Sequence, residues 1–314
     1  MNPKLITCFR DDFYSRWQLQ VLLTNLKKFN LEKDLIVLSR VEKKPSRELQ
    51  QIEKFSSANF HYFDIPYREN YLPGVIPALL SAYWKEQKPH PFFLVENDLI
   101  FLENLDWSLI QAQDNLLSET KRYNSVAYLR RFLPDEALET VTKTVDLSLS
   151  QILQMEEKND IGGAQFWFRD CADANIWKSI ETDSYKIYVM FLLLAQEYPS
   201  SPLGHTAFMF SMLWNLWKHG IHTKTGPELD FYWPADSISY LSSQPKKKIL
   251  HNSGITLEMS LQEKLFWKLN YVERHPFSEI AHWKSAPPTG LYIDRYVTAV
   301  CEAFEDWKQR GWVG

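Results

Sequence analysis

The chain has 314 residues, of which 45% are hydrophobic and 24% charged, a balance that excludes a disordered chain and predicts a packed core. Its formal net charge of −4 argues against binding nucleic acid over a broad surface, because proteins that do so usually carry a basic excess. The three cysteines are widely separated, and we find neither a signal peptide nor an apolar run of about 18 residues. These features predict a cytoplasmic protein without membrane insertion.

The first hundred residues alternate between strand and helix patterns. Short apolar runs predict strands, and apolar side chains at helical spacing between them predict helices. The predicted strands are 5–9, 34–38, 59–65 and 91–95, and the predicted helices are 17–26, 45–55 and 74–84. Strands separated by helices of this length indicate a parallel sheet with right-handed crossovers.

The rest of the chain is richer in helical patterns. We expect residues 105–158 to be helical and polar, apart from an apolar patch at 125–129, and residues 161–168 to be a turn that runs into a strand. The helices predicted after it are 172–180, 185–196 and an apolar one at 206–218. A short strand at Ile249 and a helical tail follow. This order predicts a catalytic domain over 1–255 and a C-terminal helical extension over 256–314.

Acidic residues follow the first and the fourth predicted strand, as Arg10-Asp11-Asp12 and Glu96-Asn97-Asp98. In parallel sheets ligands bind at the carboxyl ends of the strands. A buried carboxylate is costly unless it pairs or binds a cation, and Mg²⁺ and Mn²⁺ take carboxylate ligands. The alternative is an ordinary polar turn. No G-x-G-x-x-G or G-x-x-x-x-G-K-[ST] follows a strand, so a dinucleotide fold or a P-loop kinase has no support.

The segment 92–101 resembles the D-x-D motif of the GT-A glycosyltransferases, with Glu96 in place of the first Asp. The resemblance implies that Asp98 binds a divalent metal and that Glu96 binds the donor ribose or a metal-bound water. The segment 249–254 resembles the late H-x-x-G element of the family, in which His251 would complete the metal shell and Gly254 would lie at the donor. Taken alone, a histidine in a loop is more often an ordinary surface or core residue.

Further segments resemble the family in the same chain order. Residues 160–168, with Gly162 and Gly163, are similar to a small-residue turn that lets the backbone approach the donor sugar; a plain turn is the alternative. By the same resemblance the end of the first strand would hold the nucleotide, with Thr7, Arg10 and Asp11, and a lysine would meet the diphosphate, as Lys247 or Lys248. These lysines precede His251, whereas the family's lysine follows the glycine.

An inverting enzyme also needs a base to deprotonate the acceptor hydroxyl. The acid that the family often carries at the start of a later helix is missing here. The remaining candidates for this catalytic role are His205, Glu228 and Asp230. The H-x-x-G element is most typical of retaining members, which need no such base, and it therefore favours retention.

The resemblance implies a GT-A (Rossmann-like) α/β fold, with a mixed, mostly parallel sheet flanked by helices. It also implies a glycosyltransferase that uses Mn²⁺ or Mg²⁺ and a nucleotide-sugar donor, with UDP-sugars first among the candidates. The acceptor stays open between a glycan, a protein, a small molecule and a hydroxymethylated base of viral DNA. Two alternatives remain: a non-catalytic relative that binds nucleotide or sugar, and a nucleotidyltransferase, whose Gly-rich basic loop after the first strand is missing here.

Overall fold

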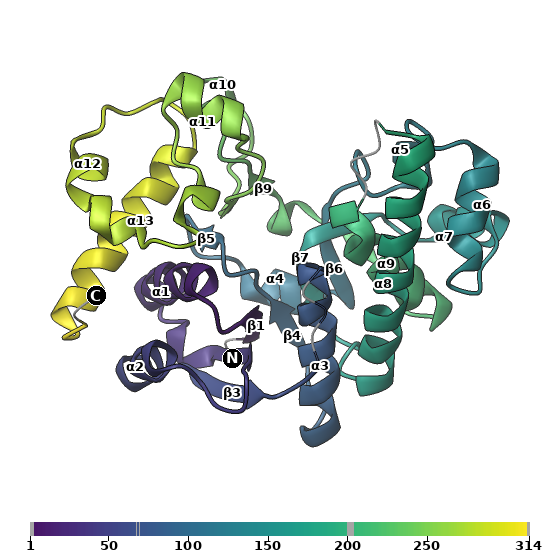
Figure 1. The fold of residues 1–314 in the computed structure, drawn as a ribbon, viewed down its shortest axis with the longest axis horizontal. Helices are drawn as coiled ribbons and strands as arrows, with labels where there is room; N and C mark the ends of the chain where they lie inside the picture. Colours follow the sequence, from purple (N-terminus) through teal and green to yellow (C-terminus); the bar gives the residue numbers. More distant parts are fainter. Residues whose placement is uncertain (1–2, 67, 69, 200–203, 313–314) are drawn as a thin grey trace. The chain divides into compact units, whose positions relative to one another are not determined.

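A computed structural model describes residues 3–66, 68, 70–199 and 204–312 (Figure 1). The chain divides into two compact units, each built from separate stretches of sequence. Unit 1 comprises Met1–Tyr62, Val95–Trp107 and Asp230–Gly314, and unit 2 comprises Phe63–Leu94 and Ser108–Leu229. The predicted extension, residues 256–314, lies within unit 1, and its separation from a catalytic domain stays a prediction.

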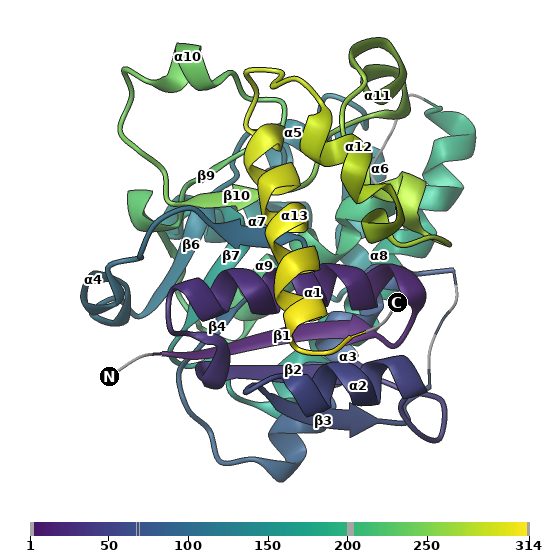
Figure 2. The same cartoon turned by 90° about the vertical axis from the view of Figure 1, so that its left-hand side faces the viewer.

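Unit 1 combines strands of two sheets with helices. Its strands are β1 (Lys4–Arg10), β2 (Leu35–Arg40), β3 (Asn59–Phe63), β5 (Leu99–Phe101), β9 (Phe231–Tyr232) and β10 (Ile249–His251). Its helices are α1 (Phe13–Lys28), α2 (Arg47–Phe55), α10 (Ile238–Leu241), α11 (Leu257–Glu263), α12 (Ile280–Ser285) and α13 (Ile293–Gln309). The strands run in the order β3-β2-β1, with β1 parallel to β2, and a second small sheet has the order β5-β10-β9. Figure 2 shows α1 and α2 on the same face of β1, β2 and β3.

Helix α1 connects the parts of unit 1 that carry the site described below. The indole of Trp17 donates to the backbone oxygen of Tyr271, at 3.0 Å. The side chain of Asn25 makes two hydrogen bonds, of 2.9 and 2.8 Å, with the backbone of Phe101 in β5. Trp307 of α13 donates to a backbone carbonyl of α1, and α13 crosses α1 in Figure 2. Trp17 and Asn25 on α1 therefore hold the segment at Tyr271 and β5, and Trp307 holds α13 against the backbone of α1.

Unit 2 has its own strands and a larger share of helix. Its strands are β4 (Phe92–Leu94), β6 (Asn115–Glu119), β7 (Gly162–Phe168) and β8 (Lys224–Thr225), in the order β4-β7-β6-β8. Its helices are α3 (Val75–Glu86), α4 (Trp107–Gln111), α5 (Val126–Leu129), α6 (Asp135–Lys143), α7 (Leu149–Lys158), α8 (Ala174–Glu197) and α9 (Ala207–Lys218). β7 is antiparallel to β4 and to β6, whereas β8 is parallel to β6. Helix α8 packs against both α3 and α9 (Figure 1).

The predicted α/β class, with a mixed sheet flanked by helices, is confirmed. Each strand and helix predicted in the first hundred residues is present, and β1 and β2 are parallel as expected. The prediction that residues 105–158 are helical is wrong at β6. Leu116 and Leu117 are buried there, in register with Trp167 and Phe166 of β7. The conformation of so short an apolar segment depends on the strand with which it pairs, because its own sequence pattern is ambiguous between helix and strand.

The two helices predicted at 172–180 and 185–196 form the single helix α8, so the predicted break is wrong. Its polar residues are satisfied within the helix or by α9. Ser184 donates to the backbone oxygen of Glu181 at 3.0 Å, and Asp183 contacts Lys186 at 2.9 Å and Asn215 at 3.3 Å. Polar side chains are compatible with an unbroken helix when their hydrogen-bond or ion-pair partners lie one turn away along it. In the part of the chain that the structure describes, no helix combines the length and apolarity that crossing a membrane requires.

Candidate metal site in unit 1

Strand pairing brings two distant acidic and basic segments together in unit 1. The residues that follow β4 form a tight turn, in which the backbone N–H of Leu99 donates to the oxygen of Glu96 at 3.2 Å. β5 then pairs antiparallel with β10, with Leu99 opposite His251. The next residue, Asn252, donates its backbone N–H to the oxygen of Asp98 at 3.1 Å. This register places His251 beside Asp98.

The side chains of this turn and of β10 converge. His251 Nε2 lies 3.1 Å from Glu96 Oε2 and 3.6 Å from Asp98 Oδ1. The ammonium of Lys268, in the 3₁₀ turn η5 (Lys268–Tyr271), contacts the other oxygen of Asp98. Asp98 and His251 are 5% and 7% exposed, whereas the side chain of Glu96 is 30% exposed. The cluster is thus buried on one side and open to solvent at Glu96.

The charges in the cluster stabilise one another. Burial alone would raise the pKa of Asp98, but Lys268 and His251 hold it below its ordinary value. Burial alone would lower the pKa of His251, yet the carboxylates of Asp98 and Glu96 outweigh this effect and raise it. The pKa of Lys268 is likewise raised, because the attraction of Asp98 exceeds the effect of burial. The cluster therefore holds both carboxylate and cationic groups in a small buried volume.

Glu96, Asp98 and His251 fit a divalent cation. One ligand atom from each lies within 4.8 Å of the other two. Within the described residues, Asp98 Oδ1 is buried and accepts no hydrogen bond, which is the state of an oxygen that a cation would satisfy. Two carboxylates and one imidazole are suitable ligands for Mn²⁺; Mg²⁺ prefers oxygen ligands alone.

Aromatic rings line the histidine side of the cluster. The ring of Trp233 is stacked on His251 at 5.9 Å between centroids, and Phe231 lies 5.5 Å from it. Gly254 has a φ of +91°, in the region that favours glycine, and a Cβ at this position would lie 3.6 Å from the ring of Trp233. The glycine of the predicted H-x-x-G element is therefore required by the backbone turn after β10. Its predicted contact with a donor stays a prediction.

The residues predicted to hold the nucleotide lie at and near the end of β1. Thr7 is fully buried in that strand. Arg10 forms an ion pair of 2.7 Å with Asp12, the residue whose side chain caps α1. Asp11 accepts hydrogen bonds from Arg16, at 2.8 Å, and from the backbone and hydroxyl of Ser46. The carboxylate of Asp11 thus connects α1 with the start of α2, which is a structural role.

The predicted lysines and one predicted base lie elsewhere in unit 1. Lys247 donates to the backbone oxygen of Phe231 at 2.9 Å, so its ammonium is held on β9. The backbone oxygen of Lys248 accepts from Leu102, which extends the pairing of β10 with β5. Asp230 is half-buried directly before β9. Roles for these residues in donor binding or catalysis stay predictions.

The other predicted residues belong to unit 2. Gly162 and Gly163 lie in β7, where a Cβ on Gly162 would meet Leu117 Cβ at 2.4 Å, so the strand pairing itself requires this glycine. Glu228 is half-buried in the 3₁₀ turn η4 (Pro227–Leu229). His205 lies in the 3₁₀ turn η3 (Gly204–Thr206), and its side chain is outside the described part of the chain.

Lys268 was missed in the sequence. It follows His251 at a distance that no motif predicts, within the run Leu265-Phe266-Trp267-Lys268. A lysine inside an aromatic and apolar run is a usable signal, because burying an ammonium requires a charged partner. Tyr14 on α1 and Tyr296 on α13, also not predicted, lie close enough for the charge of Asp98 to raise the pKa of each, in addition to the larger effect of burial.

No protein-family model and no curated protein sequence matches the chain. Among solved structures it matches the bifunctional glycosyltransferase WbbM, at 11% identity and a TM-score of 0.46, over 98% of this chain. It also matches the galactosyltransferase LgtC in complex with donor and acceptor sugar analogs, at 11% identity and a TM-score of 0.45, over 97% of this chain and 99% of LgtC. The chain spans about half the length of WbbM, 52%. At TM-scores below 0.5 these likenesses carry no argument about activity, so the proposal below depends on the side chains of unit 1.

Proposed function

We propose that the chain is a glycosyltransferase of the GT-A type, which binds a nucleotide-sugar donor through a divalent cation held by Glu96, Asp98 and His251. The observation that carries the proposal is the buried oxygen of Asp98, which accepts no hydrogen bond among the described residues and lies 3.6 Å from His251 Nε2. Lys268 already pairs with the other oxygen of Asp98, so a divalent cation would satisfy the one carboxylate oxygen that is left without a hydrogen bond in the described part of the chain.

The residues of the cluster have distinct roles in this proposal. A divalent cation, when bound, supplies positive charge against the negative charge that develops on a departing nucleoside diphosphate. Asp98 and His251 would hold the cation from the buried side, and Glu96, whose side chain is 30% exposed, would hold it at the solvent side, where a donor would enter. Lys268 contacts Asp98, and its ammonium would supply a second positive charge for the diphosphate by exchanging the carboxylate for a phosphate oxygen.

The acceptor and the stereochemistry are left open by these residues. Retention would need no base, whereas inversion would draw on His205, Glu228 or Asp230. Mn²⁺ suits the imidazole ligand better than Mg²⁺ does, and UDP-sugars are the first donors to test. Glycans, proteins, small molecules and hydroxymethylated DNA bases remain the acceptor classes.

The test is thermal stabilisation of the purified protein by UDP-, GDP-, CMP- and dTDP-sugars, with and without Mn²⁺. A ligand that binds only the folded state raises the melting temperature by mass action. We expect one nucleotide family to raise it, only when Mn²⁺ is present. The effect should be lost in Asp98→Asn and kept in the matched control Glu103→Gln, which neutralises a half-exposed carboxylate after β5.

Turnover separates catalysis from binding alone. The nucleotide that stabilises the protein is incubated with it and Mn²⁺, and release of the nucleoside diphosphate is followed. Release that depends on Mn²⁺ and on Asp98 supports a transferase, whereas stabilisation without release, with every acceptor class supplied, supports the non-catalytic relative. If no nucleotide shifts the melting temperature with metal present, the proposed function is wrong.

A further inference from the structure

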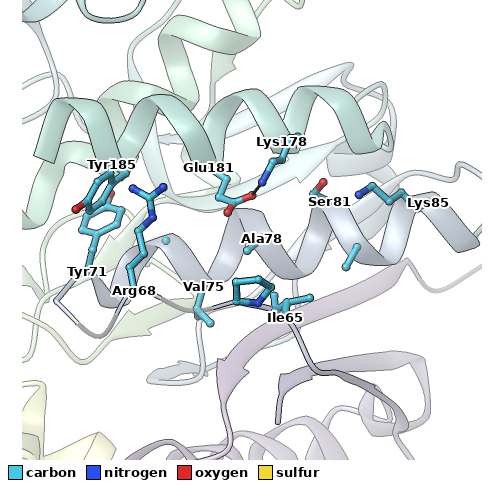
Figure 3. Close-up of a pocket in the computed structure, with 13 residues that line it drawn as sticks. Ile65, Arg68, Tyr71, Val75, Ala78, Ser81, Lys85, Lys178, Glu181 and Tyr185 are labelled. Carbon is cyan, nitrogen blue, oxygen red and sulfur yellow. Dashed lines mark hydrogen bonds and ion pairs between the residues drawn. The ribbon is translucent and has the colours of Figure 1, made fainter. Parts of the chain in front are cut away.

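Unit 2 contains a cavity that none of the predicted site residues lines. It has a volume of about 340 Å³, within the range of roughly 300–1,000 Å³ that is usual for ligand pockets. Figure 3 shows it between α3 and α8, and its lining also includes the chain at Ile65 and Pro66, before α3. Its floor is apolar and comes mainly from α3 and that chain, with Ile65, Pro66, Val75, Ala78 and Ala82.

The charged side chains that line the cavity are mostly cationic. They are Arg68, Lys85 and Lys178, against the single carboxylate of Glu181. Lys178 already neutralises Glu181, with its ammonium 2.7 Å from the carboxylate. The lining therefore has a net charge of +2, from Arg68 and Lys85, beside an apolar floor.

The two remaining cations lie toward opposite ends of the cavity. In Figure 3, Arg68 lies beside Tyr185 at one end, and Lys85 lies at the other end of α3. Val75 and Lys85 are separated by ten residues of α3, which is about 15 Å of helix. The guanidinium of Arg68 lies 3.6 Å from the ring centre of Tyr185, and this contact orients its plane.

We propose that this cavity binds an elongated organic dianion, with an apolar chain along α3 and one acidic group at each end. The guanidinium of Arg68 would pair with one acidic group, since its planar fork of N–H donors matches a carboxylate or phosphate. The ammonium of Lys85 would pair with the other. The apolar chain would cover Ala78 and Ala82, which are half-buried. This site is separate from the proposed transfer activity and does not depend on it.

The experiment is isothermal titration calorimetry of the whole chain with ten-carbon probes that differ only in charge. Decanedioate carries a carboxylate at both ends, decanoate at one end, and 1,10-decanediol and 1,10-diaminodecane at neither. We expect decanedioate to bind most tightly, decanoate about five- to tenfold more weakly because one charged hydrogen bond is lost, and the diol and the diamine to show no binding. Inorganic phosphate at the same concentration is the control for simple ion binding.

Variants assign the binding to this cavity. Arg68→Gln and Lys85→Gln should each lower the affinity for decanedioate by about five- to tenfold, and the double variant should not bind it. Ala78→Leu should lower the affinities for decanedioate and for decanoate by the same factor, because the larger side chain occupies space at the floor of the cavity without changing its charge. Lys158→Gln, an exposed lysine of unit 2 outside the cavity, should change nothing. Melting temperatures of all variants confirm that they are folded.

Three results would overturn the proposal. The first is that decanedioate does not bind. The second is that the diol binds as tightly as the dianion, which would make the cavity a simple apolar gap. The third is that decanedioate binds the double variant as it binds the parent chain, which would place its binding elsewhere.

Discussion

The predicted site residues of the two units differ in what explains them. In unit 1, Glu96, Asp98 and His251 each offer one ligand atom, and these atoms lie within 4.8 Å of one another. In unit 2, Gly162 and Gly163 are explained by packing, because a Cβ on either would meet an atom of the protein within 3.0 Å. The comparison teaches that the residues of the resemblance in unit 1 form a cluster of possible metal ligands, whereas in unit 2 strand packing accounts for Gly162 and the end of the Met209 side chain lies against Gly163.

The largest effect expected from this contrast is on turnover. Asp98→Asn keeps the size of the side chain but removes the charge that holds the cation. We expect kcat/KM for release of the nucleoside diphosphate to fall by about 1,000-fold, since metal charge stabilisation amounts to several kcal/mol. The measurement is donor turnover with Mn²⁺, and Glu103→Gln should stay within about twofold of the parent, as changes of exposed charge usually do. A fall of less than tenfold in Asp98→Asn would contradict the role of the cluster.

A second prediction separates the two cations that compete for Asp98. Lys268→Met removes the ammonium that contacts this carboxylate. We expect Mn²⁺ to bind about tenfold more tightly, because no internal cation has to be displaced, and UDP to bind about tenfold more weakly, because a phosphate partner is lost. Both affinities are measured by calorimetry. Lys246→Met, which changes a mostly exposed lysine of the same unit, should leave both unchanged.

A third prediction tests the packing side of the comparison. Gly162→Ala would bring a Cβ to 2.4 Å from Leu117 Cβ and 2.8 Å from the backbone oxygen of Ser118. We expect a loss of about 1–3 kcal/mol in the free energy of unfolding, because rigid strand atoms must move.

The adjacent glycine is the matched control. A Cβ on Gly163 would meet the end of the flexible Met209 side chain, and Gly163→Ala should therefore cost less. Urea unfolding of both variants gives the two free energies. Equal costs, or none, would mean that strand packing does not explain Gly162.

The smallest effect concerns two histidines of unit 1 whose surroundings act in opposite directions. Carboxylates raise the pKa of His251, whereas burial, followed by the nearby charge of Arg16, lowers the pKa of His275 to about 3. Nδ1 of His275 accepts a hydrogen bond from the backbone of Phe277 at 3.2 Å, and this bond requires the neutral ring. Between its ordinary pKa of 6.5 and about 3, the unfolded chain therefore binds a proton at His275 that the folded chain resists.

This difference makes folding less favourable as the pH falls through that window. We expect the free energy of unfolding of the parent chain, relative to that of His275→Asn, to fall by about 1–2 kcal/mol between pH 7 and pH 4.5. The upper limit is about 1.4 kcal/mol per pH unit, and we expect less because the ring is partly exposed. Asparagine keeps a hydrogen-bond acceptor for Phe277 and does not titrate. Urea unfolding at the two pH values measures the difference, and a constant difference would show that His275 titrates normally.

The sequence predicted those parts of the fold that local patterns determine. The strands and helices of the first hundred residues follow apolar periodicity, and they are present as predicted. Strand β6 was missed because its leucines owe their conformation to pairing with β7, which lies far along the chain. The break predicted within α8 was wrong because partners in α9 and along the helix satisfy its polar residues.

The candidate site shows the same division. Glu96 and Asp98 were predictable because acids after an apolar strand indicate the carboxyl edge of a sheet. Their proximity to His251 was expected from the family resemblance alone, because it depends on the pairing of two three-residue strands, β5 and β10, which local patterns do not specify. Lys268 could not be assigned to the cluster for the same reason, since Trp17 fixes its segment through a contact between distant parts of the chain.

The most direct test of the central claim is a titration of the protein with Mn²⁺, followed by the electron paramagnetic resonance signal of the free ion, with and without UDP. We predict one Mn²⁺ bound per chain, tighter binding when UDP is present, and loss of binding in Asp98→Asn but not in Glu103→Gln. Mn²⁺ binding that is equal in the parent chain and in Asp98→Asn, or that UDP does not affect, would contradict the account.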